Sequence, residues 1–171
     1  AARARRPGMK RGELDAAVVD GELRVVPAAR GCIYLVPSRV VADLMAWNAA
    51  GWRKASEKDL AKVGSGMSSP LPLVLRLLEL DGRVERTLEG GKLDAERYLW
   101  RKAAWTLPAA SKHPLDGMIG AFLDFAGPVT IGQISKWSAV PQRDLAPALE
   151  RLGAVTVTID GIGDAYAREI D

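Results

Sequence analysis

The 171-residue sequence predicts an α+β fold of tandem helix-turn-helix units, each a helical bundle with a β-hairpin wing. Three segments show the same order of a helical pattern, a glycine and two short apolar strands, and such repetition is typical of tandem units. The segments begin at Leu14, Leu75 and Leu145. The glycines between helix and hairpin are Gly21, Gly82 and Gly153. Each can take the left-handed conformation that ends a helix.

The repeats divide the chain into three expected units: residues 1–37, 38–106 and 107–171. The first would hold only a recognition helix and its wing, since residues 9–20 supply one helix before the hairpin. We therefore expect that part of the first unit lies before Ala1. The second and third units each have room for helices upstream of their wings.

In the first hairpin, Leu23 and Val25 alternate with Arg24 and Val26, whereas residues 32–36 are apolar on both faces. We expect the second strand to be the more buried of the two. Cys32, the single cysteine, is then expected to be a buried thiol.

In the second unit, Ser38 is a candidate N-cap for a helix that reaches about Asn48, with Gly51 as its stop. Ser56 and Asp59 resemble a capping box for a short helix, which would leave Trp52 in a loop. Residues 70–80 form an apolar helix with two prolines in its first turn. A helix that is apolar all round is expected in the interior, which leaves Arg76 to meet a ligand.

The third unit has the clearest helix-turn-helix pattern. Thr130 and Gln133 predict a capping box for its second helix. Gln142 and Arg143 begin the third helix, where a recognition helix presents side chains to the major groove. Pro147 suggests that the regular part of this helix begins only near residue 144. Residues 160–161 then turn the last hairpin.

The chain is mildly basic, with a formal net charge of +3 and a sequence pI of about 9.2. Its cations gather in the first eleven residues and around the second wing, which is the pattern a polyanion would require. The alternative is that these are ordinary solvated charges, interleaved with the wing's own carboxylates. The residues that we expect to contact DNA are Lys10, Arg11, Arg30, Lys54, Arg76, Arg83, Arg86, Lys92, Arg97, Arg101, Gln142 and Arg143.

Other classes of protein find little support. No apolar run approaches the roughly 20 residues of a membrane span, and the single cysteine fits a cytoplasmic location. One histidine, His113, cannot build a zinc site or a catalytic triad. The glycine-rich pieces lack the lysine and serine spacing of a phosphate loop. We expect no metal and no cofactor.

Four segments resemble the winged-helix DNA-binding family that includes the bacterial interstrand-crosslink DNA glycosylases. They are "SPLPLVLRLLELDGRVER", "GKLDAERYLWRKAAW", "FAGPVTIGQISKWSAVPQRDLAPALERL" and, for the first wing, "RGCIYLVP" at residues 30–37. The resemblance covers nearly the whole chain. It implies tandem winged helices that cradle duplex DNA. For the glycosylase branch it implies hydrolysis of the bond between an alkylated base and its sugar.

The catalytic motif of that branch does not carry over. It consists of a glutamine, an apolar residue and a glutamine or aspartate, upstream of the first wing, and the sequence here holds no such segment. The triplet Gln142-Arg143-Asp144 has a charged middle residue and lies in the third unit. We therefore assign no catalytic residue.

Three functions stay open: a protein that binds duplex DNA and could act in DNA repair, a protein-protein adaptor built on winged helices, and the non-catalytic part of an alkylated-base glycosylase. Winged helices serve as docking surfaces as well as DNA readers, so the fold alone does not decide. An exposed apolar surface on a recognition helix would favour the adaptor.

Overall fold

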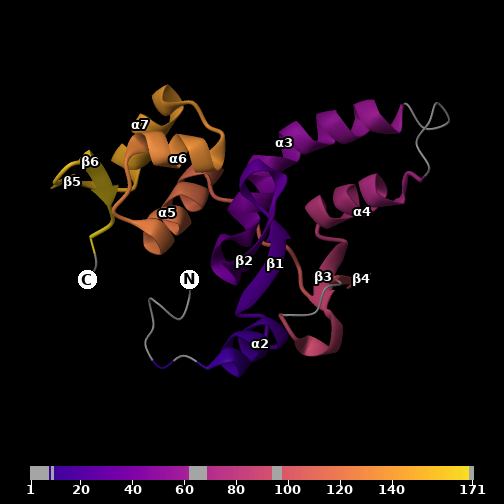
Figure 1. The fold of residues 1–171 in the computed structure, drawn as a ribbon. Coiled ribbons are helices and arrows are strands. Elements are labelled where there is room, and N and C mark those ends of the chain that lie inside the picture. The colour runs from indigo at the N-terminus through magenta and orange to yellow at the C-terminus, as the bar shows by residue number, and fades with distance from the viewer. Residues whose placement is uncertain (1–7, 9, 62–68, 94–97, 170–171) are drawn as a thin grey trace. The chain divides into compact units, whose positions relative to one another are not determined.

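A computed structural model describes residues 8, 10–61, 69–93 and 98–169, and shows an α+β protein with three two-stranded sheets (Figure 1). Two compact units are present. The first comprises Ala1–Val26, Ile33–Val41 and Gly51–Leu107, and the second comprises Pro27–Cys32, Ala42–Ala50 and Pro108–Asp171. The three-unit boundaries at residues 37 and 106 stay a prediction. None of the helices in the described ranges has the length and apolar character that crossing a lipid bilayer requires.

The first unit contains two helix-and-hairpin segments. Its elements are α2 (Arg11–Val19), β1 (Leu23–Pro27), β2 (Ile33–Pro37), the second half of α3 (Val41–Leu60), α4 (Leu71–Leu80), β3 (Val84–Leu88) and β4 (Tyr98–Lys102). β1 pairs with β2, and β3 pairs with β4 in antiparallel register, from Val84 opposite Lys102 to Leu88 opposite Tyr98.

The expectation that the second strand of the first hairpin is the more buried is wrong. Val25 and Val26 of β1 are buried, whereas Val36 is the buried residue of β2. Cys32, expected to be a buried thiol, is exposed just before β2. A two-stranded sheet leaves much of its surface uncovered, and apolar composition alone does not say which strand the rest of the fold covers.

The helix expected to stop near Gly51 instead runs without interruption from Val41 to Leu60. A glycine inside a helix costs only about 1 kcal/mol, which packing readily offsets. Ser56 and Asp59 therefore lie within α3 and start no new helix. Ser38 does not cap it, because its hydroxyl donates to the carbonyl of Gly21.

The expectation that the apolar helix at residues 70–80 lies in the interior is also wrong, because α4 is partly exposed. Its buried residues are Glu79 and Leu80, near its end, while Leu71 is 58% exposed and Val74 is 39% exposed. The apolar sequence therefore covers both a packed face and an exposed face. Hydrophobicity on every side of a helix indicates burial only when neighbouring elements surround it.

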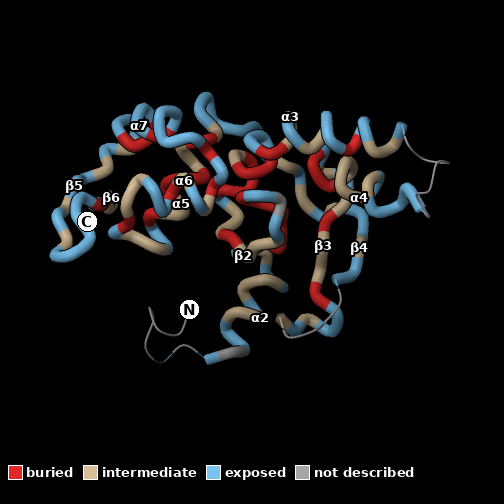
Figure 2. The backbone as a smooth tube through the Cα atoms, turned by 45° about the horizontal axis from the view of Figure 1, so that its top comes forward, coloured by how far each residue is buried: buried red, intermediate tan, exposed pale blue. Residues whose placement is uncertain are grey.

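The second unit is a three-helix bundle with a hairpin. Its elements are α5 (Pro114–Ala126), α6 (Ile131–Ser138), α7 (Gln142–Arg151), β5 (Val155–Ile159) and β6 (Gly163–Ala167), preceded in the chain by the turn η1 (Ala29–Gly31) and residues 42–50 of α3. Figure 2 shows the buried inner turns of the bundle in red. The fully buried side chains there include Met118, Ile119, Ile134 and Leu145.

Two predictions for the helix starts of this unit can be compared with the structure. Thr130 Oγ1 accepts a hydrogen bond from the Gln133 amide at 3.2 Å, and Gln133 Oε1 accepts one from the Thr130 amide at 2.8 Å, which confirms the capping box. α7 begins at Gln142 and contains Pro147, so the later start near residue 144 is wrong.

The glycines between helix and hairpin take the predicted left-handed conformation, with positive φ at Gly21, Gly82 and Gly153. After α4, the Gly82 amide donates to the Glu79 carbonyl and the next amide donates to the Leu78 carbonyl, both at 2.9 Å. The two corresponding bonds after α7 are both 3.0 Å. α4 and α7 thus end in the same Schellman motif, and each hairpin leaves its helix in the same way.

Candidate nucleic-acid interface

The second wing carries five of the twelve predicted DNA contacts, and the cations that the structure describes there fall into two groups. Arg83, Lys92, Arg101 and Lys102 are exposed, whereas Arg86 is largely covered. Among the wing residues that the structure describes, 83–93 and 98–102, Glu89 is the exposed carboxylate. Over these described residues, the exposed cations therefore outnumber the exposed carboxylates four to one.

Arg86 is engaged inside the protein. Its Nε and Nη2 donate to the two carboxylate oxygens of Glu79 at 2.9 and 3.0 Å, and its side chain is only 14% exposed. The guanidinium also lies over the ring of Trp100, 4.5 Å from the centroid. The ion pair holds the hairpin to α4 and the ring contact joins β3 to β4, so this arginine is placed to stabilise the wing and not to meet a phosphate.

Glu79 is almost fully buried, and burial raises the pKa of its carboxyl. The hydrogen bond and charge of Arg86, and more weakly the charge of Arg76, act in the opposite direction on this pKa. A buried carboxylate without such a partner would be strongly unfavourable. The pairing with Arg86 thus explains how the Glu79 carboxylate can be buried near the end of α4.

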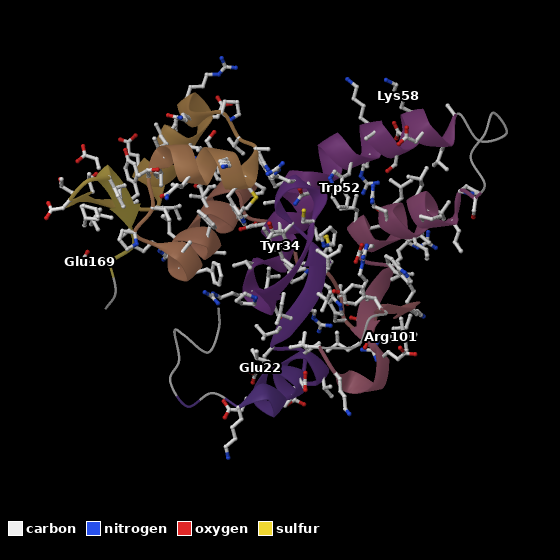
Figure 3. All side chains as sticks on the ribbon, viewed as in Figure 1. Glu22, Tyr34, Trp52, Lys58, Arg101 and Glu169 are labelled. Atoms are coloured by element: carbon white, nitrogen blue, oxygen red, sulfur yellow. The ribbon has the colours of Figure 1, made fainter. Side chains whose placement is uncertain are left out.

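A second buried carboxylate, Glu85, organises the other face of the hairpin. It accepts from Arg24 at 2.8 Å, from Arg101 at 2.7 Å and from the amide of Ala104 at 3.3 Å. Arg101 still has 55% of its side chain exposed, so it can meet a ligand while it is held in place (Figure 3). Arg24 is covered and lies over the ring of Trp105 at 4.6 Å.

Trp52 lies in α3 and not in the loop that the sequence suggested (Figure 3). Its ring is half-buried and receives the guanidinium of Arg76 at 4.6 Å from the centroid. The tryptophan is therefore occupied by a cation of its own chain. Lys54, on the same helix, is exposed.

Two of the hairpin tips share a backbone conformation. Arg30, in η1, has φ 57° and ψ 18°, and Gly90, in the turn η3 (Glu89–Gly91), has φ 61° and ψ 16°. The left-handed region is unfavourable for an arginine and easy for a glycine. Arg30 is exposed, and η1 packs against α6 within the second unit.

α7, the predicted recognition helix, presents the two predicted residues at its start. Gln142 and Arg143 are exposed, and 85% of the Arg143 side chain is open to solvent. The nearest carboxylate oxygen belongs to Asp144, at 3.7 Å from Arg143 Nε. The buried face of α7 consists of Leu145, Ala148 and Leu149.

The structure says less about the three remaining predicted DNA contacts, Lys10, Arg11 and Arg97. Lys10 is exposed before α2, and Arg11 begins that helix, although its side chain lies outside what the structure describes. Arg97 also lies outside the described residues. The roles of Arg24, Glu79 and Glu85 were not predicted. A charged residue inside an apolar strand or helix was the available signal for Arg24 and Glu79, whereas the mixed sequence of β3 gave none for Glu85.

Charge is distributed unevenly along the chain. Residues 1–107 hold 19 Lys and Arg and 13 Asp and Glu, a formal charge of +6, whereas residues 108–171 hold 5 and 8, a formal charge of −3. The third hairpin carries Asp160 and Asp164 and, from 155 to 167, no lysine or arginine. A polyanion would therefore be attracted mainly by the first 107 residues. Over the described ranges, no group of His, Cys, Asp and Glu could hold a metal ion.

Comparison with known proteins supports the fold. No protein-family model matches the chain, and no curated protein sequence does. The structure is similar to that of Streptomyces sahachiroi DNA glycosylase AlkZ, with a TM-score of 0.61 and 16% sequence identity, over 96% of this chain. The chain spans 57% of the length of that structure. This protein therefore has an α+β fold that resembles the tandem winged-helix units of AlkZ, as the sequence resemblance predicted.

Proposed function

We propose that this protein binds duplex DNA, with the cations of its first 107 residues as the principal phosphate contacts. The observation that carries the proposal is the second wing, where Arg83, Lys92 and Arg101 are exposed. Glu85 of the wing and Glu79 of the adjacent α4 are buried and paired, which leaves Glu89 as the exposed carboxylate among the described wing residues. Arginine and lysine contacts to phosphate position a protein on the duplex without reading its sequence. The likeness to a DNA glycosylase supports the same function.

The wider contact set comprises the exposed predicted residues. Phosphates would be contacted by the exposed cations Lys10, Arg30, Lys54 and Lys92. Base edges would be reached from the start of α7 by Gln142 and Arg143. Arginine and glutamine can each make paired hydrogen bonds to a base in the major groove. Arg76 and Arg86 are left out of this set because their guanidinium groups lie on Trp52 and Trp100.

Fluorescence anisotropy with a labelled duplex of about 20 base pairs tests the proposal. If about four phosphates are neutralised, the logarithm of the association constant falls against log salt with a slope of roughly −3.6. Lys92→Gln should reduce this slope by about 0.9, whereas Lys112→Gln, in the exposed segment before α5, should not change it. A dissociation constant weaker than about 10⁻⁴ M at low salt would remove the proposal.

The enzymatic alternative has a separate test. Incubation with alkylated duplex DNA, followed by detection of released free base, asks whether this chain also cleaves the glycosidic bond. DNA binding without base release fits the proposal as stated. Release by the purified chain would make the protein an enzyme as well.

A further inference from the structure

α4 exposes an apolar stripe along one side. Leu71, Val74, Leu75 and Leu78 follow one another at i, i+3, i+4 and i+7, so they share one face of the helix. The first two are exposed and the other two are half-buried. The side chains of Glu79 and Leu80, by contrast, are buried. A recognition helix that reads bases would carry polar side chains on its open face.

The stripe continues into a hollow at the foot of the wing. The hollow has a volume of about 400 Å³ and is lined by Leu78, Gly82, Arg83, Val84, Lys102 and Ala103. Leu78 belongs to both, so stripe and hollow form one surface, which we call the α4 groove.

Backbone contacts fix the walls of the α4 groove. The Arg83 amide donates to the Leu78 carbonyl at 2.9 Å, and the Ala103 amide donates to the Arg83 carbonyl at 3.1 Å. At Gly82, a Cβ atom would lie 2.8 Å from Leu107 Cβ, so the chain passes close beneath it. A surface held in this way needs little reordering to receive a ligand, which favours binding.

The rim of the groove is cationic. Arg83 and Lys102 are exposed, and neither forms an ion pair with any residue in the described part of the chain. The neighbouring carboxylates at positions 79 and 85 are buried and already paired with Arg86, Arg24 and Arg101. Asp81, directly before Gly82, is exposed but pairs with Arg53. A negatively charged group of another molecule could therefore pair with Arg83 and Lys102 at the edge of the α4 groove.

We propose that the α4 groove docks an acidic amphipathic segment of a partner protein. Its apolar side chains would lie on Leu71, Val74 and Leu78, and its carboxylates would pair with Arg83 and Lys102. Helix-in-groove recognition uses apolar anchors at the same i, i+3, i+7 spacing. DNA is a poorer occupant, because phosphates gain nothing from an apolar stripe. This inference does not depend on the DNA-binding proposal.

The test uses a fluorescein-labelled peptide of about 16 residues as the probe. Leucines repeat at i, i+3, i+4 and i+7, and glutamates fill the other face. Its control has the same composition with the leucines scattered. We expect anisotropy to rise with a dissociation constant of about 10–100 μM for the probe and to change little for the control.

Variants of the whole chain locate the binding. Val74→Asp, and separately the double variant Arg83→Glu with Lys102→Glu, should each weaken peptide binding about tenfold or more. Val19→Asp places the same change on an exposed valine of α2 and should have no effect. Leu71→Ser repeats the apolar test if circular dichroism shows that Val74→Asp is unfolded.

Three outcomes would overturn the inference. The scattered control could bind as well as the probe, or the groove variants could bind the probe as tightly as the unaltered chain. Alternatively, sedimentation could show a dimer that Val74→Asp dissociates, which would make a second copy the occupant. If the double variant weakens only duplex binding, the two cations serve DNA and the docking proposal fails while the DNA proposal stands.

Discussion

Arg86 of β3 holds Glu79 of α4 through two parallel hydrogen bonds of 2.9 and 3.0 Å, with both side chains largely removed from water. The pair joins α4 to β3 of the second wing. Because the Arg86 guanidinium also rests on Trp100, its position is fixed on two sides. The orientation of the second wing therefore depends on a charge that does not face a ligand.

Arg86→Leu should lower the free energy of unfolding by about 3 kcal/mol at pH 7, because it leaves the Glu79 carboxylate buried without its partner. Arg86→Lys keeps the charge but loses the paired bonds, so we expect a smaller loss. Urea unfolding followed by circular dichroism measures both. A loss below about 1 kcal/mol for the leucine variant would mean that Glu79 is exposed or otherwise paired.

Glu79 should also give stability a pH dependence. Burial raises the pKa of this carboxyl, so the folded protein holds the proton more tightly than the unfolded chain does. The free energy of unfolding therefore falls as pH rises from the ordinary pKa of 4.5 to the raised value. Glu79→Gln should remove this part of the slope in urea titrations across that window. Glu57→Gln, on the exposed side of α3, serves as the control and should retain it.

The features that the sequence predicted well are those that depend on a few adjacent residues. The Thr130–Gln133 capping box and the glycine-ended helices before the wings arise from local hydrogen bonds, so their residue types are sufficient to indicate them. The same holds for the turn at residues 160–161 between β5 and β6. The winged arrangement followed because these local signals recur at similar spacing.

Features that depend on distant contacts could not be predicted in this way. Gly51 looked like a helix stop, but the continuous α3 shows that its small cost was outweighed. The pairing of Arg86 with Glu79, and the stacking of Arg76 on Trp52, join different elements and leave no local pattern. The exposed apolar side of α4 was hidden for the same reason, since its sequence fits an enclosed helix equally well.

Two glycines that end helices should tolerate alanine differently. Gly153 has φ 61°, and no atom lies within 4 Å of the position that a Cβ would take, so Gly153→Ala should cost about 1–2 kcal/mol from the left-handed conformation alone. Gly82 has φ 67°, and a Cβ there would lie 2.8 Å from Leu107 Cβ. We expect Gly82→Ala to cost at least about 1 kcal/mol more, in thermal or urea unfolding. Equal losses would show that residue 107 can move aside freely.

Arg30→Gly separates stability from binding at the first wing tip. Gly90 shows that the equivalent turn of the second wing is made by glycine in the same conformation. Arg30→Gly should therefore raise the free energy of unfolding by about 0.5–1 kcal/mol, since it relieves a left-handed arginine. If Arg30 meets a phosphate, the same change should lower duplex affinity and reduce the salt slope by about 0.9. Arg30→Gln, which keeps the backbone cost and removes the charge, should lose the affinity without the gain in stability. An unchanged salt slope in both variants would exclude Arg30 from the DNA contacts.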